Sequence, residues 1–153
     1  NQKKMKRRFK KNVEVWLFGA DNILDVVDER LLNFKWQNLG KLTQVQVAAM
    51  MSKADIFTDF SSHQAMGLSA LEAMAAGCAV IVPSNGGATE FVKHRRNGIV
   101  ADTSNFKASV TALEELVADD QLRKQIQLNA INDVVQYYPE KSSYNILKTL
   151  FGE

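Results

Sequence analysis

Residues 67–82 read GLSALEAMAAGCAVIV, a run of strong helix formers followed by a continuous apolar stretch. The first ten residues favour a helix, and Gly77 ends it because glycine readily adopts the left-handed conformation found after helix C-termini. The stretch CAVIV at 78–82 is typical of a strand that is buried on both faces of a parallel sheet. A helix that leads into such a strand is the repeating unit of α/β proteins, and it decides the fold class.

Strand-like and helix-like segments alternate along the rest of the chain. Apolar, β-branched and aromatic runs predict four further strands at residues 13–18, 34–37, 55–59 and 98–101. Helices are predicted after the capping-box pair Thr43 and Gln46 and at residues 88–93, 106–117, 122–134 and 143–151. About five strands alternating with helices predict one α/β domain over residues 1–153, with a Rossmann-like, doubly wound parallel sheet and helices on both faces.

Composition excludes several classes of protein. The 153 residues are 46% hydrophobic and include one cysteine and two histidines, His63 and His94, which lie far apart in the sequence. A disulfide framework is therefore excluded, and no metal site is expected. No run of about 18 uncharged apolar residues occurs, so we expect neither a membrane span nor secretion. The motifs G-x-G-x-x-G and G-x-x-x-x-G-K-[ST] are absent, which disfavours nicotinamide dinucleotides and P-loop chemistry.

Basic residues are concentrated at the N-terminus, where seven of the 19 Lys and Arg residues fall within residues 1–11. The rest of the chain carries 12 basic and 17 acidic residues. A basic arm can attract nucleic acid or anionic lipid, but such runs are more often the solvated face of a helix. No nucleic-acid partner is expected, because the remainder of the chain is acidic. A second basic group, at residues 94–96, can face an anionic membrane or a lipid-linked acceptor, although a solvated surface patch is the more common interpretation.

In doubly wound sheets, ligands bind beyond the carboxyl ends of the strands. The loops that this rule selects are residues 19–22, 40–43, 61–68 and 84–89. Gly67 and Leu68 open the predicted helix, whose free amides and dipole can bind a phosphate oxygen. Glu72 lies about one turn further along, where its carboxylate can accept two hydrogen bonds from a ribose diol. On spacing alone, Glu72 is better explained as a residue on the solvated side of an alanine-rich helix than as a ribose ligand.

Residues 54–102 resemble the C-terminal donor domain of the group 1 retaining glycosyltransferases, which have the GT-B fold. The family carries a G-L turn, the helix L-E-A-M-A-x-G, a strand, then G-G-x-x-E and N-G. The matching elements stand here in the same order, and they are Gly67-Leu68, residues 71–77, Gly86-Gly87 with Glu90, and Asn97-Gly98. The turn at residues 38–40 and the two C-terminal helices agree as well, so the resemblance covers nearly the whole chain.

The resemblance implies roles for particular residues. Glu72 corresponds to the second of two acids in the family and is expected to hold the ribose hydroxyls of a nucleotide sugar. The first acid, which binds hydroxyls of the donor sugar, is replaced by Gln64. An amide can still donate and accept such bonds without a negative charge. We interpret Gln64 as an adaptation to another donor sugar, such as a deoxysugar, with a degenerate site as the alternative.

The other expected donor contacts come from three loops. Met66, Gly67 and Leu68 form the turn whose amides face the diphosphate and the sugar. Residues of the remaining two loops contact the base or line the far side of the site, and they are Gly40, Lys41, Asn85, Gly86 and Gly87.

The implied activity is transfer of a hexosyl or deoxyhexosyl group, with retention, from a nucleoside-diphosphate sugar to a saccharide or lipid-linked acceptor in bacterial surface polysaccharide synthesis. No cofactor other than the donor is expected. The expected location is cytoplasmic, or peripheral at the inner face of the plasma membrane. Two alternatives stay open at this point. One is a catalytically inactive nucleotide-sugar-binding domain, and the other is an α/β module that binds nucleic acid through its basic arm.

One departure from the family concerns the start of the chain. The family's donor domain begins with a strand and a G-R turn that find no match here, and the N-terminal acceptor domain is missing too. We therefore expect a fragment of a larger enzyme that is inactive alone. Without the first family strand, we expect five strands with direct pairing across the gap, or an intermolecular contact there.

Overall fold

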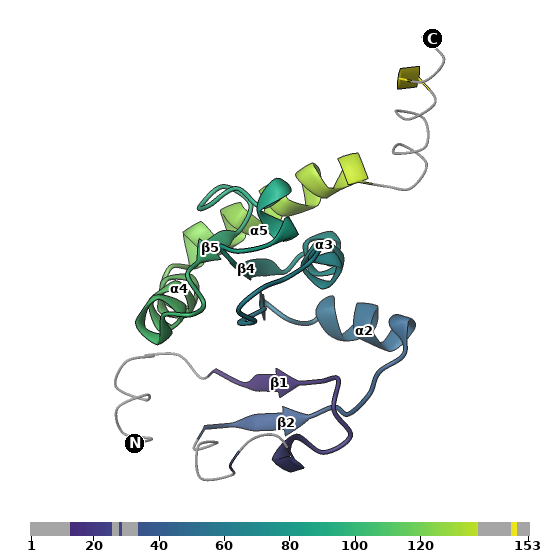
Figure 1. Cartoon of the computed structure of the whole chain (residues 1–153), viewed down its shortest axis with the longest axis vertical. Coiled ribbons are helices and arrows are strands. Elements are labelled where there is room, and N and C mark those ends of the chain that lie inside the picture. The colour runs from purple at the N-terminus through teal and green to yellow at the C-terminus, as the bar shows by residue number, and fades with distance from the viewer. Residues whose placement is uncertain (1–12, 26–27, 29–33, 138–147, 150–153) are drawn as a thin grey trace.

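The computed structural model describes residues 13–25, 28, 34–137 and 148–149, whose arrangement is drawn in Figure 1. The strands are β1 (Val15–Leu17), β2 (Trp36–Asn38), β3 (Ile56–Thr58), β4 (Ala79–Pro83) and β5 (Ile99–Ala101). The α-helices are α2 (Gln44–Met51), α3 (Leu68–Ala75), α4 (Phe106–Ala118) and α5 (Asp120–Val134). Short 3-10 helices are η1 (Ile23–Asp25), η3 (Gly87–Glu90) and η4 (Val135–Tyr137). The predicted alternation of five strands with helices is confirmed.

β3, β4 and β5 form a parallel sheet in that order. Every residue of β4 is buried, as its unbroken apolar sequence predicts. Val80 and Val82 join one apolar cluster with residues of α2, α3 and α5, whereas Ala79 and Ile81 join another with residues of α4 and α5. Since successive side chains of a strand point to opposite faces, helices cover both faces of β4. This is the predicted Rossmann-like arrangement.

The connection from α3 to β4 has the geometry that the sequence predicts. Gly77 has φ +89 and donates its N–H to Met74 O at 3.1 Å. Cys78 follows as a fully buried core residue, and its thiol lies 3.1 Å from Met51 O. Burial raises the pKa of Cys78 to about 11, so the thiol is protonated at neutral pH.

β1 and β2 pair in parallel as a second sheet, which lies apart from β4 and β5 in Figure 1. Direct pairing across the gap, the first of the two expected outcomes, is not found, because no ladder joins β1 to β3 in the described part of the chain. The second, an intermolecular contact at the gap, stays a prediction. β3 is positioned by β4 and by the preceding helix α2, whose Met51 packs in the core beside β4. No residue of β1 or β2 is fully buried, whereas every residue of β4 is.

Several element boundaries differ from those predicted. The helix expected at 88–93 is the shorter η3, because the Lys93 N–H bonds to the side chain of Asn97 at 2.6 Å instead of continuing a helical ladder. The capping box at Thr43 is confirmed, with the Thr43 N–H donating to Gln46 Oε1 at 2.8 Å. The basic segment 1–11 and most of the helix predicted at 143–151 lie outside the described residues.

Candidate functional site

The turn that opens α3 depends on a glycine. Gly67 is the N-cap residue of α3 and has φ +76, a left-handed conformation that side chains disfavour. A Cβ at this position would lie only 2.8 Å from Ala88 Cβ and 2.8 Å from Gln64 Oε1. The neighbours Met66 and Leu68 are 67% and 60% exposed. The turn is therefore packed tightly from behind and open to solvent at the residues predicted to face the donor.

The loop at residues 64–66 interlocks with the loop at residues 85–87 through the backbone. The Gln64 N–H donates to Asn85 O at 3.3 Å, and Gln64 O accepts from the Gly87 N–H at 2.9 Å. A Cβ on Gly86 would lie 2.0 Å from Gln64 O. A Cβ on Gly87 would lie 2.3 Å from Ala65 O. The structure thus brings these predicted site residues together, and the adjacent glycines are needed for that approach.

The side chain of Gln64 is held from the end of β3. Its Nε2 donates a hydrogen bond to Asp59, the residue that follows β3 directly. Its Oε1 is buried and accepts no hydrogen bond from the described residues. Sequence reasoning did not identify Asp59 as a site residue. The available signal was an acidic residue at the carboxyl end of a predicted strand.

Glu72 lies on the solvent-facing side of α3. Leu68 and Glu72, four residues apart, are both exposed, whereas Ala70, Ala73 and Met74 are buried. Its carboxylate has no hydrogen-bond partner among the described residues, which leaves its acceptor sites open to a ligand. The predicted position, one turn beyond the Gly67 turn and on the face that Leu68 exposes, agrees with this arrangement.

Gly40 and Lys41 belong to the other sheet. Gly40 follows β2 and accepts a hydrogen bond from the Gly19 N–H at 2.9 Å, while Lys41 forms an exposed ion pair with Asp21 at 2.6 Å. Within the described ranges, no hydrogen bond or ion pair joins either residue to the loops at 64–68 or 85–87. Their role at the base of the nucleotide stays a prediction.

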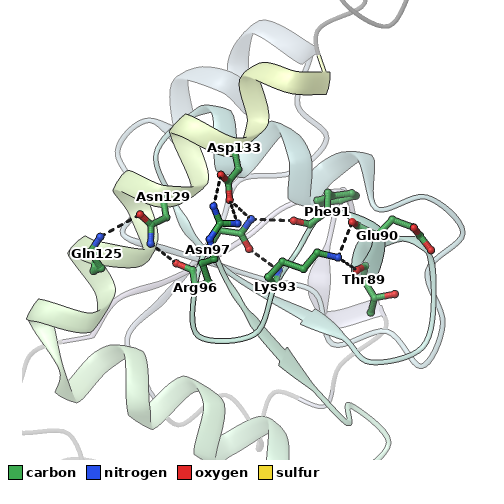
Figure 2. Close-up of polar contacts among 9 residues, drawn as sticks. All are labelled: Thr89, Glu90, Phe91, Lys93, Arg96, Asn97, Gln125, Asn129 and Asp133. Carbon is green, nitrogen blue, oxygen red and sulfur yellow. Dashed lines mark hydrogen bonds and ion pairs between the residues drawn. The ribbon is translucent and has the colours of Figure 1, made fainter. Parts of the chain in front are cut away.

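Asn97, from the predicted N-G pair, forms the hub of a polar network that anchors η3 to α5 (Figure 2). This side chain is 1% exposed and donates to Phe91 O at 3.0 Å and to Asp133 Oδ2 at 2.7 Å. It also accepts from the Lys93 N–H at 2.6 Å. Figure 2 shows Asn97 between the segment after η3 and α5. Asn97 is thus a structural residue that fixes the segment after η3 against α5.

The predicted basic group at residues 94–96 is largely neutralised. Arg95 forms an ion pair with Glu115, and Arg96 forms one with Asp133 at 2.9 Å. The guanidinium groups therefore face acidic side chains of the same chain, which weakens their attraction for an anionic surface.

Three further features bear on the class of site. No group of three or more metal-ligating side chains is found among the described residues. Over the same residues, no helix has both the length and the apolar composition that a membrane crossing requires. A hollow of about 250 Å³ lies beside α4, with Phe60 and Phe106 in its wall, but no charged side chain lines it. This hollow therefore lacks the groups that recognise a diphosphate.

The chain resembles proteins of known sequence over much of its length. An uncharacterized glycosyltransferase of Methanocaldococcus jannaschii is 28% identical over 145 residues, which are 90% of this chain and 37% of that protein. The N,N'-diacetylbacillosaminyl-diphospho-undecaprenol alpha-1,3-N-acetylgalactosaminyltransferase of Campylobacter jejuni is 31% identical over 91 residues, which are 60% of this chain and 24% of that enzyme. The chain therefore spans 37% and 24% of the length of these two relatives.

A solved structure and a family model agree with these relatives. HepE of Anabaena, in complex with UDP and glucose, has a TM-score of 0.76 at 20% identity, covering 98% of this chain and 52% of that one. At this identity the likeness establishes the fold. The model of the family described as glycosyl transferases, group 1, matches residues 2–133. Because this match takes in both loops and the helix between them, the chain belongs to the group 1 glycosyltransferases.

Proposed function

We propose that this chain holds the nucleotide-sugar donor of a glycosyltransferase. The observation that carries the proposal is the Gly67 turn, which opens α3, interlocks with the Gly86–Gly87 loop and has the unpartnered carboxylate of Glu72 one turn further along the exposed face. Membership of the group 1 family and a structural neighbour that binds UDP and glucose support the same role.

In the proposed complex, the donor lies across the N-terminus of α3. Backbone amides of the turn at residues 66–68 stabilise the diphosphate, helped by the positive end of the helix dipole. Glu72 accepts hydrogen bonds from the ribose hydroxyls, and Gly86 and Gly87 let the backbone approach the ligand from the far side. Gly40 and Lys41 are proposed to contact the base. No cofactor other than the donor takes part.

The complete enzyme is proposed to transfer the sugar with retention to a saccharide or lipid-linked acceptor. The Campylobacter relative, by its name, acts on an undecaprenol-linked sugar, and this supports a lipid-linked acceptor in bacterial surface polysaccharide synthesis. An N-terminal acceptor domain would supply the other side of the site. The proposed location is the cytoplasm or the inner face of the plasma membrane.

Glu72→Ala in the full-length enzyme tests this proposal. Loss of a charge-assisted hydrogen bond is expected to weaken nucleotide binding by roughly 1.5–3 kcal/mol, which raises the Kd about 10- to 150-fold. Isothermal titration calorimetry with UDP, GDP and dTDP measures the change.

The matched control is Ser69→Ala, which alters an exposed neighbour on α3 and is expected to leave the Kd unchanged. Unchanged affinity in Glu72→Ala would remove Glu72 from the site. Binding without transfer to any acceptor would favour the inactive binding domain instead.

A further inference from the structure

Asp59 is fixed in place before it reaches Gln64. Its backbone N–H donates to Ile81 O at 2.9 Å, which extends the pairing of β3 with β4 by one residue. One carboxylate oxygen, Oδ1, accepts from the Ser61 N–H at 2.9 Å. The backbone of Asp59 is therefore held by the sheet and its side chain by its own loop, and only Oδ2 is left to bind a partner.

Oδ2 of Asp59 determines which way the amide of Gln64 points. An ionised carboxylate only accepts hydrogen bonds, so the Gln64 group that contacts it must be the Nε2 amide. Oε1 is consequently directed to the other side, where it lies 2.8 Å from the place that a Cβ on Gly67 would occupy. The amide thus fills the space beneath the Gly67 turn in one orientation.

The contact with Asp59 favours an amide over an acid at residue 64. A glutamate at position 64 in the same conformation would place a second carboxylate against Asp59, and two carboxylates in contact repel each other. An acid at 59 with an amide at 64 is one way to keep a single negative charge in this contact. An amide at 59 with an acid at 64 is the other.

We propose that Asp59 is a positioning residue for the donor sugar, which acts by orienting the amide of Gln64 beneath the Gly67 turn. The proposal rests on the proposed donor-binding function and adds a residue and a physical requirement to it. Residues 59 and 64 form an obligate pair of one acid and one amide. By supporting the Gly67 turn from beneath, the pair fixes the position of the turn residues that face the sugar part of the donor.

A charge exchange in the full-length enzyme tests the pair. Gln64→Glu is expected to lower kcat/KM for the nucleotide sugar about tenfold or more, because a second carboxylate faces Asp59. The double variant Asp59→Asn/Gln64→Glu has one acid and one amide again, in exchanged positions, and is expected to recover to within about threefold of the wild type. Kinetics with UDP-glucose, GDP-mannose and dTDP-rhamnose as donors give these values.

A comparison of two ligands separates positioning from general loss of structure. Asp59→Ala is expected to raise the KM for the nucleotide sugar about fivefold or more. The Kd for the free nucleoside diphosphate is expected to change less than about twofold, because the pair supports the part of the turn that faces the sugar. Thr111→Ala, at an exposed position of α4 outside the loops of the proposed site, is the control and is expected to match the wild type.

Two results would overturn the proposal. One is a double variant that is as impaired as Gln64→Glu alone, and the other is an equal loss of affinity for the nucleoside diphosphate and the nucleotide sugar in Asp59→Ala. Both results require that the wild-type enzyme transfers sugar in the same assay. A wild type that binds none of the three donors would instead show that the proposed function itself is wrong, and the positioning role with it.

Discussion

Gln64 and Glu72 lie eight positions apart and have opposite surroundings. Gln64 is half-buried, with its backbone bonded to the loop at 85–87 and its amide to Asp59, whereas Glu72 is exposed and has no partner among the described residues. A ligand can reach the carboxylate of Glu72 without any change in the protein. The amide of Gln64 already has a function inside the fold, so substitutions at the two positions are expected to affect different properties.

Gly67→Ala is expected to destabilise the fold by roughly 2–4 kcal/mol, measured by urea unfolding. About 1–2 kcal/mol comes from a side chain in the left-handed conformation, and the rest from the 2.8 Å approach of the new Cβ to Ala88 Cβ.

Gly40→Ala is the matched control for this substitution. Gly40 has φ +69, but a Cβ there would meet no atom within 4 Å, so only the conformational part of the loss is expected. Equal losses for the two variants would show that the turn at Gly67 can relax away from Ala88.

At the scale of secondary-structure elements, η3 and α5 are joined by a polar contact centred on Asn97. One buried side chain, Asn97, bonds both to Phe91 O, just after η3, and to Asp133 of α5, as Figure 2 shows. The ion pair between Arg96 and Asp133 lies at the solvent-exposed edge of this contact and contributes less than the buried amide.

Asn97→Ala is expected to destabilise the protein by roughly 2–4 kcal/mol, because Phe91 O loses its partner in a buried place and the Lys93 N–H loses its partner in a partly buried one. Urea unfolding followed by circular dichroism measures this loss. Asn129→Ala removes a more exposed bond to Arg96 O and serves as the control, with an expected loss below about 1 kcal/mol. Similar losses for the two variants would contradict a central role for Asn97.

Sequence patterns predicted some elements better than others, for physical reasons. α3 and β4 were predicted closely, since their composition and burial agree. η3 was predicted as a longer helix, because a bond from a side chain to the backbone leaves no periodic signal. Asp59 was missed for a similar reason. Its importance depends on a contact with Gln64, and one sequence does not show which side chains bond within a loop.

At the scale of the whole molecule, the two sheets differ in how they are stabilised. The sheet around β4 has a continuous core on both faces, whereas the residues of β1 and β2 are only partly buried or exposed. Apolar burial is the main favourable term in folding, so local opening is expected to be easier in the two-stranded sheet.

Hydrogen–deuterium exchange mass spectrometry on the 153-residue chain tests this difference. Amides of β4 are expected to exchange at least about 100-fold more slowly than those of β1 and β2, since β4 opens only when the core does. The exposed end of α5 provides an internal reference for local fraying. Equal protection of the two sheets would show that they unfold as one unit.

The backbone interlock between residues 64–66 and 85–87 also restricts how this site can be altered or redesigned. Neither loop can be transplanted from a relative by itself. The backbone of residues 64–66 fits only against glycines at 86 and 87, so a different backbone path in one loop would clash with the other. The two loops must be exchanged together, as a matched set. Across an alignment of relatives, the same restriction would produce correlated changes between positions about twenty residues apart.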